Sequence, residues 1–232
     1  MLRSVPILFI TIVILLISAC QTSPQQNQDG AENDISYLAK TDIDTVTDTH
    51  YRSAQAHLMT LAVKLYRRNP RYCQAAAGLD SCVKKISAHR TSDTLAQRCP
   101  NGLECMKQAL EQDFSGDRIE LLVAGMQRMI DASYNFKSSF YITDQLDGQK
   151  LYNSARNIEI VVWRMKHHID KHGKVLILSN GTGRGVENLS FERLFGKLIS
   201  LQDTMATIVN EQQHRLVKNI IQRLATAVFL PI

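Results

Sequence analysis

Apolar residues after about residue 49 recur at the three- and four-residue spacing of amphipathic helices. The most regular run alternates steps of four and three: Leu151, Ala155, Ile158, Val162, Met165 and Ile169. A second long run follows Ser190, the expected N-cap, through Leu194, Leu198, Leu201, Met205 and Ile208 to Leu216, Ile220 and Leu224. Further helices are predicted over about 49–69, 79–90, 101–112 and 117–133. The pattern predicts an all-α fold, a helical bundle with long antiparallel C-terminal helices.

The first nineteen residues have the pattern of a signal peptide. A short basic start containing Arg3 precedes an almost unbroken apolar run from Ile7 to Ile17. This run is too short to cross about 30 Å of hydrocarbon comfortably as a mature helix, and it suits the apolar region of an export signal. We therefore expect residues 1–19 to be removed from the mature protein.

The segment Leu16-Ile-Ser-Ala-Cys20 resembles the lipobox of bacterial lipoproteins, in which an aliphatic and two small residues precede a cysteine. The resemblance implies cleavage before Cys20 and attachment of fatty acyl chains to that residue, so the lipid bilayer is an expected partner. Several acyl chains give lasting anchorage where one would not. In the same class, Gln21 after the modified cysteine indicates the periplasmic face of the outer membrane, with the inner membrane as the alternative.

Composition and charge divide the remaining chain in two. Residues 20–48 are rich in Gln, Asn, Ser, Thr and Asp, carry a net charge of −5, and have no apolar period, which predicts a flexible acidic tether. Residues 49–232 carry +9 and are expected to form the helical periplasmic domain. A basic block there, Lys64 to Arg90, suits anionic headgroups, an acidic protein partner or simple solvation. Nucleic acid is not an expected partner because the compartment offers little of it.

The other four cysteines, Cys73, Cys82, Cys99 and Cys105, fall within one short stretch. In an exported protein, two disulfides are the expected outcome. Of the three possible connectivities we favour Cys73–Cys82 with Cys99–Cys105, because each pair brackets a helix breaker, Gly78 or Pro100 with Gly102. These bonds would staple a short helical segment. A zinc site is the rival, but the stretch has no C-x₂-C pair.

Candidate chemistry elsewhere is sparse. The run 175–178 followed by Gly181, Gly183 and Gly185 superficially resembles a phosphate loop but has no Lys-Ser/Thr pair, so a connector is preferred. His168 and His172, beside His167, have the spacing of a metal pair on a helix. Flanking lysines disfavour a cation there, and basic residues at a helix C-terminus are explained by its dipole. We therefore expect no catalytic residue, no cofactor and no metal site.

Four segments, 65–70, 151–157, 189–196 and 227–232, resemble an uncharacterised family of Gram-negative lipoproteins. That resemblance implies no activity. The lipobox, the tether, the long helices and the absence of a catalytic constellation from the sequence predict an adaptor or scaffold in a cell-envelope assembly, with a protein partner there. The alternative hypothesis is a helical binding module for a lipid or another small apolar ligand, and a third is a hydrolase that uses His168.

Overall fold

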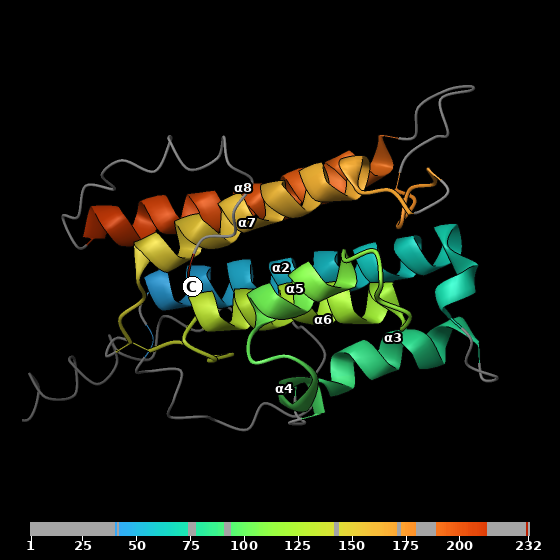
Figure 1. Cartoon of the computed structure of the whole chain (residues 1–232). Helices are drawn as coiled ribbons and strands as arrows, with labels where there is room; N and C mark the ends of the chain where they lie inside the picture. Colours follow the sequence, from blue (N-terminus) through green and yellow to red (C-terminus); the bar gives the residue numbers. More distant parts are fainter. Residues whose placement is uncertain are drawn as a thin grey trace, which may run out of the picture. The chain divides into compact units, whose positions relative to one another are not determined.

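The computed structural model describes residues 40, 42–73, 78–90, 94–141, 144–170, 173–179, 189–212 and 231 (Figure 1). These residues form α2 (Asp42–Arg68), the 3₁₀ turn η2 (Pro70–Tyr72), α3 (Leu79–Ala88), α4 (Thr94–Arg98), α5 (Gly102–Ala109), α6 (Arg118–Ser133), α7 (Gly148–His167) and α8 (Ser190–Gln212). In this part of the chain the β pairing is an isolated bridge between Ile169 and Val175. The predicted all-α fold is confirmed. None of the described helices has the length and apolar character needed to cross a membrane.

The two long C-terminal helices pack antiparallel, as predicted (Figure 1). Lys166 near the end of α7 ion-pairs with Glu192 in the first turn of α8, with 3.1 Å between Nζ and Oε1. At the opposite end, a Cβ atom added to Gly148 would meet the side chain of Asn210. The predicted continuation of the last helix through Leu216, Ile220 and Leu224 lies outside the described residues.

Helix α2 packs against both α8 and α6, and it runs antiparallel to each. The Lys64 ammonium donates to the Ser190 hydroxyl at the start of α8 (2.7 Å). Tyr51 and Tyr66, near the two ends of α2, reach residues Asp131 and Asp117 near the opposite ends of α6. It follows that α2 and α7 run in the same direction, so their C-terminal ends lie at the same end of the bundle.

The first described helix starts earlier than expected, because α2 begins at Asp42 rather than near residue 49. Asp42 and Asp44 lie in its first turn, where acidic side chains interact favourably with the helix dipole. Asp48 is buried, and its carboxylate accepts a hydrogen bond from the backbone N–H of Phe140 (2.9 Å) and pairs with Lys40. The polar composition of residues 42–48 therefore reflects the favourable position of acidic side chains in the first helical turn and the tertiary contacts of Asp48.

Candidate functional site

Both disulfides have the pairing that the sequence favoured. Cys73 is bonded to Cys82 with 5.9 Å between their Cα atoms, and Cys99 to Cys105 with 5.4 Å. The first bond ties η2 to α3, and the second ties the end of α4 to α5. Among the described residues no group of three or more His, Cys, Asp and Glu side chains is placed to hold a metal ion.

A polar cavity of about 420 Å³ lies between η2, α3 and the start of α6. Its lining combines two basic and two acidic side chains with part of a disulfide: Arg71, Tyr72, Cys82, Lys85, Ser115, Gly116, Asp117 and Glu120. The Cys73–Cys82 bond holds Arg71 and Tyr72 beside α3, because it closes a loop of only nine residues. The cavity is the candidate functional site of the described domain.

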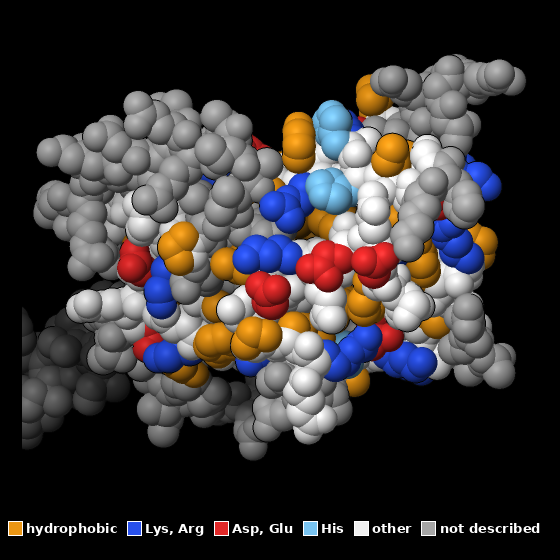
Figure 2. Space-filling view, viewed as in Figure 1, with side chains coloured by type: hydrophobic (Ala, Val, Ile, Leu, Met, Phe, Trp, Pro, Cys, Tyr) orange, Lys and Arg blue, Asp and Glu red, His pale blue; other side chains and the backbone are white. Residues whose placement is uncertain are grey.

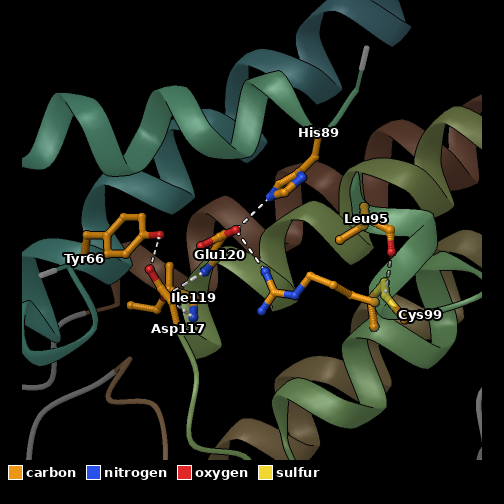
Figure 3. Close-up of polar contacts among 9 residues, drawn as sticks. Tyr66, His89, Leu95, Cys99, Asp117, Ile119 and Glu120 are labelled. Carbon is orange, nitrogen blue, oxygen red and sulfur yellow. Dashed lines mark hydrogen bonds and ion pairs between the residues drawn. A yellow bond between two sulfur atoms is a disulfide. The ribbon is translucent and has the colours of Figure 1, made fainter. Parts of the chain in front are cut away.

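Asp117 forms the lower part of this site as the N-cap of α6 (Figure 3). One carboxylate oxygen accepts from the backbone N–H groups of Ile119 (3.0 Å) and Glu120 (2.9 Å). The other accepts from the Tyr66 hydroxyl (2.8 Å). Burial raises the pKa of the Asp117 carboxyl, an effect that these hydrogen bonds partly offset. Burial beside this carboxyl also raises the pKa of the Tyr66 phenol.

Glu120 connects three helices around the same cavity (Figure 3). Its Oε1 atom lies 2.7 Å from Nε2 of His89, just after α3, and 3.1 Å from Nη1 of Arg98, at the end of α4. The side chains of Glu120 and His89 are only 15% and 11% exposed, so solvent screens this pair less than a surface pair. The carboxylate therefore holds α3 and α4 against α6.

The segment after α7 closes over the end of α2. Its residues Leu176 and Ile177 are buried. The Leu176 carbonyl accepts from Arg71 Nη2 (2.8 Å) and from the Tyr72 hydroxyl (2.7 Å). Asn69 exchanges hydrogen bonds with the backbone of Leu178, donating from Nδ2 (2.9 Å) and accepting at Oδ1 (2.8 Å). The run 175–178 lies between α7 and α8, as expected of a connector, but it is a packed strap and not a flexible one. The glycine-rich loop 181–185 lies outside the described residues.

A second polar cluster, which the sequence analysis missed, joins α2 to α6. The Asp131 carboxylate accepts from the Tyr51 hydroxyl (2.6 Å) and from the Gln55 amide (2.9 Å). Arg90 donates to the Tyr51 hydroxyl and lies 3.6 Å from the other Asp131 oxygen. Burial raises the pKa of Asp131, while its hydrogen bonds and the nearby Arg90 act in the opposite direction. Tyr51 and Gln55 lie 80 and 76 residues from Asp131 in the sequence, and Arg90 lies 39 residues from Tyr51, so no local motif signals the cluster.

The other candidates of the sequence analysis are placed as follows. His167 stacks on Trp163, and its Nδ1 atom lies 2.7 Å from the carbonyl oxygen of that residue. His168 Nδ1 lies 3.0 Å from the carbonyl oxygen of Arg164. Each histidine is therefore engaged with its own helix, whereas His172 and the proposed lipidation site Cys20 lie outside the described residues.

Comparison with family models, curated proteins and solved structures found no match. The fold and the site define a class of protein: an all-α domain that is stapled by two short disulfide loops and has a polar cavity beside one of them.

Proposed function

We propose that the protein is a lipid-anchored adaptor or scaffold of the bacterial envelope, attached through Cys20 to the periplasmic face of the outer membrane. The observation that carries this proposal is the cysteine pairing. The sequence contains five cysteines, and two disulfides use all of them except Cys20. Structural disulfides are typical of oxidising compartments outside the cytosol. The remaining cysteine is the one that the lipobox resemblance selects for acylation.

The adaptor role is supported by the way in which the acidic side chains are used. Asp117, Glu120 and Asp131 all bond to residues of neighbouring helices. These contacts fix the relative positions of α2, α3, α4 and α6, as expected for a rigid domain that presents its surface to a partner. Exposed apolar side chains at the end of the domain where α2 begins and α6 finishes, such as Val46 at 38% and Phe136 at 66% exposure, are available for such contacts.

The anchor is tested by growing cells with radiolabelled palmitate and comparing three forms of the full chain. We expect label in the unmodified protein, none in Cys20→Ser, and undiminished label in the matched double variant Cys73→Ser/Cys82→Ser. Detergent phase partition should follow the same order, because acyl chains transfer the protein to the detergent phase. Label that persists in Cys20→Ser contradicts the proposed anchor.

The adaptor role is tested by placing a photo-crosslinking amino acid at Val46 or Phe136 in the intact envelope. A discrete adduct of constant mass is expected, and it should disappear with Cys20→Ser, which leaves the fold untouched but removes the protein from its membrane. The matched control is the exposed position Lys84 on α3. Crosslinks that are absent at both test positions, or equally frequent at Lys84, contradict an adaptor surface there.

The cavity favours a second candidate function, a binding module in the same location. The hypothesis of a small apolar ligand fits this cavity poorly, because Arg71, Lys85, Asp117 and Glu120 line it. Such a lining suits a small ligand that carries both a negative and a positive group. Glycylglycine is a simple zwitterionic probe, and we expect it to raise the thermal midpoint of the protein but not that of Lys85→Gln. An equal effect on both forms contradicts binding in the cavity.

A further inference from the structure

Basic side chains gather at the end of the bundle where α2 and α7 finish and α8 begins. We call this the basic end. Helix α6 also begins at this end, because Asp117 bonds to Tyr66 and Gln112 bonds to the carbonyl of Ile169. Among the described residues the basic end contains nine basic side chains, Lys64, Arg67, Arg68, Arg71, Arg118, Arg164, Lys166, Lys174 and Arg193, against five acidic ones, Glu111, Asp113, Asp117, Asp170 and Glu192. Figure 2 shows several Lys and Arg side chains along the right-hand edge of the molecule, where Figure 1 places this end of α2. The formal excess is four positive charges.

Exposed apolar side chains lie at the same end. Trp163 is 48% exposed on the last turns of α7, Ile169 follows that helix at 45%, and Leu189 precedes α8 at 62%. The ion pair between Lys166 and Glu192 shows that these two helix ends are adjacent. Tryptophan is enriched where an apolar medium meets water, because its ring is amphipathic. Basic residues around exposed apolar side chains are typical of surfaces that bind anionic membranes.

We propose that the basic end docks on the surface of an anionic phospholipid bilayer, with Trp163, Ile169 and Leu189 entering the interfacial layer. The inference rests on the proposed anchoring, which holds the domain next to that surface. The charge excess is complementary to acidic headgroups, and each basic residue near such a surface contributes about 1 kcal/mol. A bilayer can contact the apolar side chains through its interfacial layer and the basic side chains through its headgroups at the same time, whereas a purely charged partner interacts favourably with the basic side chains alone.

The length of chain between the anchor and the helices permits this orientation. Helix α2 has 27 residues and is therefore about 40 Å long, and its N-terminal end is the one nearer to Cys20 in sequence. The 21 residues between Cys20 and Asp42 extend at most about 70 Å. That reach exceeds the length of α2, so the acylated cysteine and the basic end can meet the same bilayer.

Trp163 is the only tryptophan of the sequence, so its fluorescence reports directly on docking. The acylated full chain is reconstituted into phosphatidylethanolamine vesicles with or without phosphatidylglycerol, and with lipids brominated near the glycerol end of their acyl chains. We expect blue-shifted, bromine-quenched emission in the anionic vesicles, and reversal by high salt because the attraction is screened. In vesicles without phosphatidylglycerol we expect the emission of exposed tryptophan.

The double variant Arg67→Gln/Lys174→Gln removes two exposed charges from the basic end. At a fixed salt concentration it should lower the ratio of docked to undocked protein about thirty-fold, because each of the two charges contributes about 1 kcal/mol to docking. Arg52→Gln/Lys137→Gln removes the same charge from the half of the domain where α2 begins and α6 finishes, and it should have little effect. Emission that is equal in the two kinds of vesicle, or equally changed by both double variants, overturns the proposal and favours a protein partner for this end.

Flotation of the vesicles at high salt separates this inference from the proposed anchor. High salt removes electrostatic docking but not the acyl chains. A protein that fails to float at high salt lacks the anchor, whatever its fluorescence at low salt. A protein that floats at high salt while Trp163 is never quenched has the anchor and contradicts the docking of the basic end.

Discussion

Two glycine-to-alanine substitutions should have opposite effects on stability, one where α5 and α6 cross closely and one on the open surface of α8. A Cβ atom at Gly125 would lie 2.8 Å from the carbonyl oxygen of Gly102 and 2.9 Å from the Cβ atom of Cys105. Neither neighbour is the free end of a flexible side chain, and Cys105 is held by its disulfide to Cys99. The substitution Gly125→Ala must therefore push α5 and α6 apart or distort one of them.

The size of the effect follows from two opposing contributions. Alanine is better than glycine in a helix interior by about 1 kcal/mol. Inserting an extra methyl group into a closely packed contact costs typically 1–3 kcal/mol, and we take the upper half of this range because the clash is with anchored atoms. Gly125→Ala should therefore lower the free energy of unfolding by about 1–2 kcal/mol, or the thermal midpoint by about 2–8 °C.

Gly196→Ala is the matched control, because Gly196 also lies inside a long helix, α8. A Cβ atom there meets nothing within 4 Å, so only the gain in helix propensity remains. This variant should be more stable than the parent by about 0.5–1 kcal/mol. Urea denaturation of the oxidised proteins, followed by circular dichroism, measures both shifts. A Gly125→Ala variant as stable as the parent refutes the inferred close approach, and a destabilised Gly196→Ala variant refutes the open surface at α8.

Three further predictions concern polar and covalent contacts. Burial raises the pKa of Asp131, so ionisation of this carboxyl opposes folding, and stability should fall as the pH rises from the ordinary pKa of 3.8 through the raised one. Asp131→Asn should make the urea midpoint depend less on pH in this window. An unchanged dependence of the midpoint on pH would contradict this. Replacing both cysteines of either disulfide by serine should cost about 2–3 kcal/mol in the chain-entropy model, measured by urea denaturation; no loss in either pair would count against the model. The buried Arg118 guanidinium donates to four backbone carbonyls, that of the last residue of α5 and three in the loop that follows. Arg118→Ala should therefore lower the free energy of unfolding by about 3 kcal/mol, and Arg118→Lys should restore little of it, whereas full recovery with lysine would show that charge alone matters.

The long helices were predictable because a buried face imposes its period on the sequence. Leu151, Ile158 and Met165 of the predicted run are almost completely buried. Ile169 continues the same period but is 45% exposed, because α7 ends at His167 and the chain then turns into the strap. Periodicity thus predicted which face of α7 is buried, but not the residue at which packing stops.

The polar contacts around the candidate site were not predictable in this way. Tyr66 and Asp117 are 51 residues apart, and Asn69 and Leu178 are 109 residues apart. Each residue alone has an ordinary local explanation, as a core aromatic, a helix cap or a helix stop. Their pairing depends on the direction in which α6 and the strap cross the end of α2, and the sequence pattern does not contain this direction.

The basic end shows how two simple rules combine into a property that neither rule predicts alone. Basic residues are favoured in the last turn of a helix because they interact with its dipole, and both α2 and α7 end with them. On isolated helices these residues would form separate small clusters. Because α2 and α7 both run antiparallel to α8, their C-terminal ends lie at the same end of the bundle, and the two clusters merge. By contrast, Arg90 belongs to the basic block in the sequence but is held by Asp131 and Tyr51 near the other end of α2. The surface charge that a membrane would meet is therefore determined by helix direction rather than by proximity along the chain.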